Sequence, residues 1–203
     1  MQILSITPLA IPDMKLLTYK RFADERGYFT ETYRREQIWE ALEIPASKQI
    51  EQVNESFSKK GVVRGLHLQH TPPMAKIVRV VQGSMIDLGL DLRSNSPTFG
   101  KISGVKLSSN PTQDDSSWIY IPEGFAHGVF FLEDTVIEYL CTAAYAPQGE
   151  LGILPQDPEL DWSLCDTEVA VQAKEILSQA IFSEKDKQNL TLASFRDGNY
   201  AIR

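Results

Sequence analysis

The chain has 203 residues, of which 42% are hydrophobic and 23% charged, and its formal net charge is −7. The hydrophobic share predicts a folded core and excludes a disordered chain. The acidic balance, with no run of Lys or Arg, argues against a nucleic-acid surface but leaves room for a local basic pocket.

Short strands dominate the expected elements. Residues 85–93 alternate apolar and polar side chains, the period of a half-buried strand, and the Gly-Ser pair before them signals a turn. Many short strands with turns at regular spacing predict a β-sandwich or barrel. In chain order, the predicted strands are residues 2–7, 14–20, 49–58, 62–70, 75–82, 85–93, 101–108, 117–121, 127–132 and 135–142.

Two helices complete the expected elements. Residues 34–43 carry a small apolar stripe and are followed by Pro45. Residues 167–181 form an amphipathic pattern in the C-terminal part, with Asp166 as N-cap. Since the sequence shows no repeat and no linker, we expect one mainly β domain over residues 1–203 with a few short helices.

Composition also bounds the cellular context. The two cysteines, Cys141 and Cys165, give neither a disulfide framework nor a C-x-x-C metal pair, which fits a reducing cytoplasm. The N-terminal stretch lacks a basic region and is broken by Pro8 and Pro12, so it makes a poor signal peptide. No apolar run approaches the length that spans a membrane, and we expect no membrane partner.

The stretch from Gln52 to Gly83 is unusually polar for β-structure, since two of its predicted strands carry an amide pair, a guanidinium, an imidazole and an ammonium. Lys76 shares its strand face with Val78 and Val80, so it faces the core if they do. A lysine among apolar neighbours is strained, paired or placed to meet an anion.

Three histidines are the candidates for proton transfer or metal binding. His67 lies on a predicted strand, His127 stands between a turn and a strand, and His70 precedes Thr-Pro-Pro in a loop. Metal-binding cupins use an H-x-H pair, and here the second position is Gln69, a poor ligand for transition metals. We therefore expect no bound metal.

Each remaining candidate also has an ordinary structural interpretation. Tyr139 shares a face with Ile137 and Cys141, as a core tyrosine would. Asp186 fits a helix-capping or solvated acid. Arg64 and His67 are three residues apart and would face opposite sides of an ideal strand, unless a bulge at Gly65 or reach across a dimer edge reconciles them. Together the groups would suit proton transfer beside the carbonyl of a phosphorylated ligand.

Several motifs in order resemble one family. D-E-R-G-Y-F-T-E, R-G-L-H-L-Q, D-L-R-S-N-S-P-T-F-G, I-P-E-G-F-A-H-G, E-Y-L-C and S-E-K-D resemble the dTDP-4-dehydrorhamnose 3,5-epimerases and cover most of the chain. The resemblance implies a cupin-type jelly roll, a homodimer that exchanges N-terminal strands, a dTDP-linked 4-keto-6-deoxy sugar as ligand, and no metal or organic cofactor.

The resemblance also implies roles for individual residues. His67 matches the catalytic base, Asp186 its acidic partner, Lys76 the cation beside the keto oxygen, and Tyr139 the acid on the opposite sugar face. Arg26 and Arg64 match diphosphate contacts. The other matched positions, expected to contact the nucleotide or the sugar, are Phe29, Glu31, Gln52, Asn54, His127, Glu150 and Lys185.

The resulting hypothesis is an enzyme that inverts C3 and C5 of dTDP-4-dehydro-6-deoxy-D-glucose to give dTDP-4-dehydro-L-rhamnose. The chain departs from the family pattern around residues 154–156 and 163–182, which leaves inversion at C3 alone, on a related sugar, as an alternative. A non-catalytic cupin that binds a sugar nucleotide is a second alternative, opposed by the intact His67, Lys76 and Tyr139. A metal-dependent cupin oxygenase is a third, opposed by Gln69.

Overall fold

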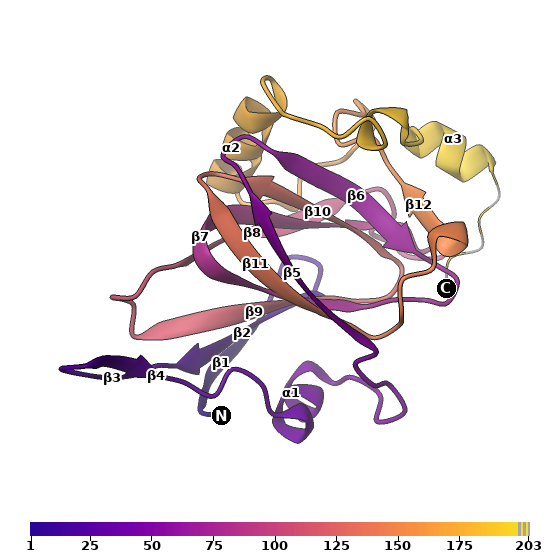
Figure 1. Cartoon of the computed structure of the whole chain (residues 1–203). Coiled ribbons are helices and arrows are strands. Elements are labelled where there is room, and N and C mark those ends of the chain that lie inside the picture. Colours follow the sequence, from indigo (N-terminus) through magenta and orange to yellow (C-terminus); the bar gives the residue numbers. More distant parts are fainter. Residues whose placement is uncertain (199, 201, 203) are drawn as a thin grey trace.

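The computed structural model describes residues 1–198, 200 and 202, and it forms two β-sheets that share one long strand, β7 (Figure 1). The first half of β7 pairs with β9 and β11, and its second half pairs with β8 and β10. The predicted mainly β sandwich with a few short helices is confirmed. The first sheet contains β1 (Ile3–Pro8), β2 (Lys15–Lys20), β9 (Asp115–Ile121), β7 (Lys76–Asp91), β11 (Thr135–Cys141) and β5 (Gln52–Ser58); the second contains β8 (Ile102–Ser109), β7, β10 (Phe125–Phe131), β6 (Val63–Gln69) and β12 (Glu150–Gly152).

The crossing of β7 from one sheet to the other corrects the predicted turn at residues 83–84. Gly83 has φ +104, a conformation that side-chain-bearing residues rarely adopt, and an added Cβ would lie 2.7 Å from the Asp134 carbonyl oxygen. The glycine therefore lets the strand bend without ending. The sequence predicted two strands where the structure has one. A Gly-Ser pair is typical of a bend as well as of a turn, and the pattern does not distinguish them.

The alternation of side chains divides the core into layers. Ile86, Leu88, Leu90 and Leu92 face one layer, as predicted, together with the C-terminal segments. Their intervening neighbours face the space between the two sheets, where Val78 and Val80 also lie. A third layer lies on the outer face of the first sheet.

Helices cover the outer faces of the two sheets (Figure 1). The predicted helix at residues 34–43 is α1 (Arg35–Leu42), which buries Ile38, Trp39 and Leu42. The predicted helix at 167–181 is α2 (Thr167–Leu177), whose first turn is capped by the Asp166 carboxylate at 2.8 Å from the Glu168 backbone nitrogen. The sequence pattern did not predict β3 (Phe22–Asp24), β4 (Gly27–Phe29), β12, α3 (Leu192–Asp197) or the 3-10 turns η1 (Pro147–Gly149) and η2 (Asp186–Gln188). No helix among the described residues is long and apolar enough to cross a membrane.

A small hairpin of β3 (Phe22–Asp24) and β4 (Gly27–Phe29) projects from the body of the molecule beside β1 and β2 (Figure 1). It exposes three aromatic side chains, and Phe29 is 72% exposed. Exposed aromatic groups gathered on a projecting element indicate a surface that another molecule covers.

Candidate functional site

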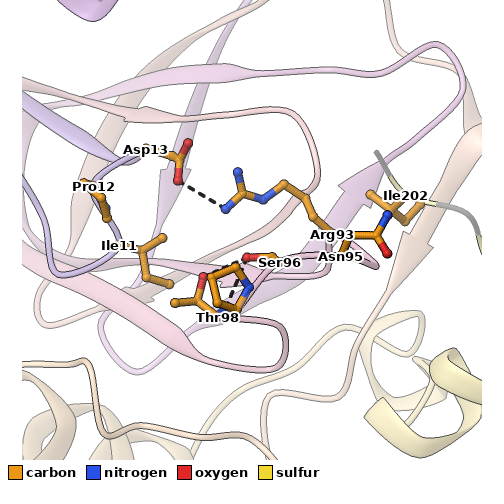
Figure 2. A pocket seen from close by; sticks show the side chains of 9 residues that line it. Ile11, Pro12, Asp13, Arg93, Asn95, Ser96, Thr98 and Ile202 are labelled. Carbon is orange, nitrogen blue, oxygen red and sulfur yellow. Dashed lines mark hydrogen bonds and ion pairs between the residues drawn. The ribbon is translucent and has the colours of Figure 1, made fainter.

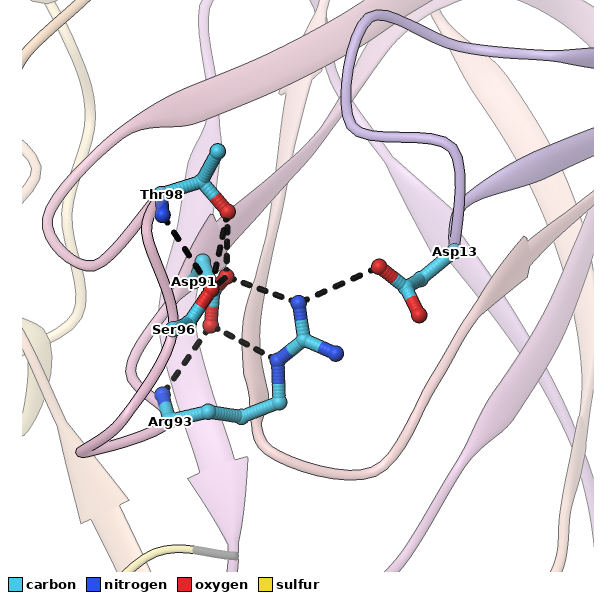
Figure 3. A network of polar contacts seen from close by, with 5 residues as sticks. All are labelled: Asp13, Asp91, Arg93, Ser96 and Thr98. Atoms are coloured by element: carbon cyan, nitrogen blue, oxygen red, sulfur yellow. Dashed lines mark hydrogen bonds and ion pairs between the residues drawn. The ribbon is translucent and has the colours of Figure 1, made fainter.

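Two cavities are candidate sites. The larger, of about 520 Å³, lies at the end of β7 and is lined by Asp13, Arg93 and the loop over residues 95–98 (Figure 2). Its only cation among the described lining residues is Arg93, whose guanidinium donates to Asp91 at 2.8 and 2.9 Å and to Asp13 at 3.2 Å (Figure 3). Hydrogen bonds to Asp91 raise the pKa of Arg93 despite partial burial.

The buried Asp91 carboxylate also accepts hydrogen bonds from Ser96 and Thr98 at 2.5 and 2.7 Å (Figure 3). Burial would raise the pKa of Asp91, but these bonds and Arg93 lower it below its ordinary value. The charges of this cluster thus satisfy one another and fix the S-N-S-P-T-F-G loop. We assign this cavity a structural role.

The second cavity, of about 340 Å³, lies between the two sheets and collects the chemically versatile side chains. The strands β5, β6, β7 and β11 each contribute to it, and the segment after β11 closes one side. Its lining residues are Gln52, Asn54, His67, Gln69, Met74, Lys76, Tyr139, Cys141, Tyr145 and Glu150.

A bulge in β6 brings His67 onto the cavity face. His127 pairs with His67 and Val129 pairs with Arg64, so β6 has one extra residue opposite β10. Gly65, at φ +118, lies in this bulge, and a Cβ there would lie 2.6 Å from the His127 carbonyl oxygen. The bulge places Arg64 and His67 on one face of the strand.

His67 and Asp186 form a close pair, although 119 residues separate them. The Nε2 atom of His67 lies 2.5 Å from Oδ1 of Asp186, and the Ser183 hydroxyl donates to Oδ2 at 2.8 Å. Burial would raise the pKa of Asp186, but the hydrogen bonds from His67 and Ser183 lower it overall. The carboxylate therefore stays charged and fixes the orientation of the imidazole.

Lys76 faces the cavity, as its shared parity with Val78 and Val80 predicts, because both valines are buried in the core between the sheets. Burial lowers the pKa of Lys76, while the nearby Cys141, Glu150 and Asp87 oppose this shift. Burial also raises the pKa of Tyr139, whereas Arg64 opposes that rise. The cavity thus contains an ammonium whose pKa is lowered and a phenol whose pKa is raised.

The mouth of the cavity is held by a polar network. Glu150 accepts a hydrogen bond from the Tyr145 hydroxyl at 3.0 Å and pairs with Lys185. Burial would raise the pKa of Glu150, and Lys185 lowers it overall. Gln52 donates to the Asn54 side chain at 2.8 Å. Four of the predicted contact residues therefore lie at or beside one cavity: Gln52, Asn54, Glu150 and Lys185.

Two further predicted residues lie next to the cavity without lining it. Arg64 donates through Nε to the Ser58 hydroxyl at 2.9 Å and lies close enough to Tyr139 to act on its pKa. His127 is buried behind the cavity, with Nε2 3.0 Å from Asp87. His127 therefore does not contact the cavity directly in this structure.

Three predicted contact residues lie away from the cavity. Arg26 pairs with Asp24 in the β3–β4 hairpin, Phe29 is exposed beside it, and Glu31 pairs with the N-terminal amine and Arg34. Within one chain the structure does not bring these residues to the cavity, because the hairpin projects outward. Their predicted contacts with the nucleotide stay predictions.

Sequence reasoning missed four lining residues as site candidates: Gln69, Met74, Cys141 and Tyr145. The shared parity of Tyr139 and Cys141 would have indicated one of them. Gln69 shares a face with His67, whereas nothing in the sequence pattern pointed to Tyr145 or Met74. Among the described residues, no three His, Cys, Asp or Glu side chains form a group that could hold a metal ion.

Comparisons with known proteins agree on one family. A family model described as dTDP-4-dehydrorhamnose 3,5-epimerase matches residues 8–194. The chain is 41% identical over 170 residues to the dTDP-4-dehydrorhamnose 3,5-epimerase of Methanothermobacter thermautotrophicus, covering 82% of each chain. It is 35% identical to the dTDP-4-dehydrorhamnose 3-epimerase of Streptomyces niveus, covering 95% of this chain and 86% of the relative.

A solved structure is similar along most of its length. The dTDP-6-deoxy-D-glucose-3,5-epimerase of Legionella pneumophila, in complex with dTDP-4-keto-L-rhamnose, superposes with a TM-score of 0.79 at 35% identity, covering 93% of each chain. This similarity confirms the predicted cupin-type jelly roll.

Proposed function

The chain belongs to the dTDP-4-dehydrorhamnose 3,5-epimerase family, and we propose that it inverts C3 and C5 of dTDP-4-dehydro-6-deoxy-D-glucose to give dTDP-4-dehydro-L-rhamnose. The observation that carries this proposal is the His67–Asp186 pair, which faces a cavity shared with Lys76 and Tyr139. These are the groups that proton removal and return beside a ketone require. No metal or organic cofactor enters the proposal.

In the proposed mechanism His67 is the base. The 4-keto group acidifies the hydrogens on C3 and C5, because the carbanion formed there is delocalised onto the keto oxygen as an enolate. Asp186 engages Nε2 of His67, which leaves Nδ1 to take the proton. The Asp186 carboxylate then stabilises the imidazolium that forms.

Lys76 stabilises the enolate oxygen. Its ammonium lines the cavity and is desolvated there, where water screens charge poorly and an ion attracts a developing oxyanion strongly. The acidic groups around it oppose the loss of its proton on burial.

Tyr139 returns a proton to the opposite face of the carbon, which re-forms the ketone with inverted configuration. Its raised pKa supports this role, because the phenol keeps its proton at neutral pH until the enolate is ready to accept it. The proton gained by His67 and the proton lost by Tyr139 are then exchanged with water before the next inversion.

Substrate binding involves the residues around the mouth of the cavity. Arg64 offers a planar fork suited to the diphosphate. Lys185 and Glu150 lie on the rim, and the amides of Gln52 and Asn54 supply donors and acceptors for the sugar nucleotide.

We infer a homodimer in which the β3–β4 hairpin of one subunit completes the site of the other. Phe29 and Tyr28 are exposed on the hairpin, and Val53 and Phe57 are exposed on the outer face of edge strand β5. Burying both surfaces in a symmetric contact would remove apolar groups from water and cover an open sheet edge. Such an exchange would also bring Arg26 and Glu31 to a nucleotide.

A second candidate is inversion at C3 alone. The 35% identity to a 3-epimerase, which covers 95% of this chain, supports this alternative. The two reactions differ in which hydrogens leave the sugar.

Proton NMR of the keto sugar in deuterated water tests both candidates. We expect deuterium at C3 and C5 with the wild-type enzyme, and deuterium at C3 alone would establish the second candidate. His67→Asn should abolish exchange and inversion, since no enolate forms. Tyr139→Phe should permit exchange with retained configuration, and inversion at the wild-type rate in this variant would contradict its role as acid.

A further inference from the structure

We propose that Gln69 is a positioning residue that holds the segment over residues 142–146 as one wall of the substrate cavity. The proposal rests on the proposed function, because it concerns binding of the sugar nucleotide in that cavity. Gln69 is the second residue after His67 on β6, its side chain lines the cavity, and only 4% of the residue is exposed.

The side-chain amide of Gln69 ties two loops together through three hydrogen bonds. Its Nε2 atom donates to the carbonyl oxygens of Pro72 and Ala144, both at 3.0 Å. Its Oε1 atom accepts from the backbone nitrogen of Ala146 at 2.8 Å. One planar group with two donors and an acceptor is needed here, and among side chains only an amide provides it.

The segment that Gln69 holds carries Tyr145 to the rim of the cavity. Residues 142–146 have no strand or helix of their own, and the side chains of Gln52 and Gln69 bond part of their backbone. The Tyr145 backbone nitrogen donates to Oε1 of Gln52 at 2.9 Å, and its hydroxyl donates to Glu150 at 3.0 Å. Two glutamines from different strands therefore fix the backbone on either side of a phenol that is itself 51% exposed.

This arrangement separates binding from chemistry. His67, Lys76 and Tyr139 lie on strands whose positions depend on sheet hydrogen bonds rather than on Gln69. Loss of the Gln69 amide would release the wall and Tyr145 while the reacting groups stay in place. A change in the Michaelis constant with little change in kcat is therefore the signature of this role.

The experiment measures kcat and KM for the keto sugar in Gln69→Met, Tyr145→Ala and the double variant, with Gln179→Met as a control at an exposed glutamine. We expect Gln69→Met to raise KM about tenfold with kcat within about threefold, because the Pro72 and Ala144 carbonyls and the Ala146 amide lose the side chain that ties them together. If Gln69 acts through Tyr145, the double variant should be no worse than the worse single variant. Additive losses in the double variant, or a fall in kcat at unchanged KM, would overturn the proposal.

Hydrogen exchange gives a readout that does not depend on turnover. The Ala146 amide should exchange slowly in the wild type and about tenfold faster or more in Gln69→Met, whereas Gln179→Met should leave it unchanged. If Gln69→Met does not fold, Gln69→Glu replaces it: this variant keeps the acceptor for Ala146 but loses both donors, so KM should rise while the amide stays protected. Fast exchange of Ala146 in the wild type would refute the clamp even if the enzyme epimerises its substrate. A wild-type enzyme without turnover but with a protected Ala146 would instead refute the proposed function.

Discussion

Replacing Asp186 by Asn tests the central pair of the site. The carboxylate oxygen lies 2.5 Å from Nε2 of His67, and at an effective dielectric constant of about 20 it stabilises a full imidazolium charge by roughly 6 to 7 kcal/mol. With the proton about half transferred, the transition state loses about 3 kcal/mol, so kcat should fall by about two hundredfold. The amide can also donate to Nε2, which would turn Nδ1 from a base into a donor.

The assay is deuterium incorporation from heavy water at saturating substrate, which reports proton removal directly. Asp157→Asn is the matched control, because Asp157 is similarly buried and its Oδ1 accepts from the Glu159 backbone nitrogen at 2.8 Å, away from the cavity. Both variants should lose stability, and only Asp186→Asn should lose rate. A folded Asp186→Asn enzyme with kcat within about threefold of wild type would refute the reasoning.

The difference in stability between the wild type and Asp186→Asn depends on pH. The folded pKa of Asp186 lies below its unfolded value of about 3.9, so the carboxylate contributes its full stabilisation above that value. The contribution is lost as the pH falls through the folded pKa. The stability difference between wild type and Asp186→Asn should therefore shrink in acid, and thermal unfolding measured from neutral pH downward checks this sign.

Three further predictions concern the rest of the site. Activity should fall at high pH as Lys76 loses its proton, since burial lowers the pKa of this ammonium and raises the pKa of Tyr139; Lys76→Arg should move this basic limb upward, and an unmoved limb would exclude Lys76 as its origin. Arg64→Lys should raise the KM for the nucleotide sugar about tenfold while the fold persists, because the ammonium cannot form a bidentate contact; an unchanged KM would show that Arg64 does not bind phosphate. Light scattering at micromolar concentration should give a dimer that Phe29→Ser weakens and Val171→Ser, at another exposed apolar residue, does not; a wild-type monomer would contradict the exchanged hairpin.

The sequence predicted best those features that depend on side-chain periodicity. The alternation over residues 85–93 identified the face of β7 that joins the apolar layer, although Asp87 and Asp91 on the other face are buried too, and the parity of Lys76 with Val78 placed its side chain on the cavity face. Periodicity failed where the backbone departs from regular pairing. Gly83 bends a strand that was expected to end, and the bulge at Gly65 shifts the parity of Arg64 relative to His67.

Long-range proximity could not be predicted from the residues themselves. Asp186 reaches His67 only because the C-terminal segment runs along the outer edge of β6, and no local pattern near either residue encodes that path. The motif resemblance implied their pairing, and the 2.5 Å contact agrees with it. No local pattern predicted the outward position of Arg26 and Phe29 either.

Two His–Asp pairs lie side by side in this fold, and their surroundings explain why we assign them different roles. His127 pairs with His67 across neighbouring strands, but its side chain is 9% exposed and Asp87 is fully buried, whereas the His67 side chain is 23% exposed and lines the cavity. A base must reach its substrate, which favours His67. The charge of Asp87 instead acts on Lys76, where it opposes the effect of burial on the pKa of the ammonium. In the proposed mechanism, the His67–Asp186 pair thus removes the proton, while Asp87 of the other pair helps to keep Lys76 charged beside the enolate oxygen.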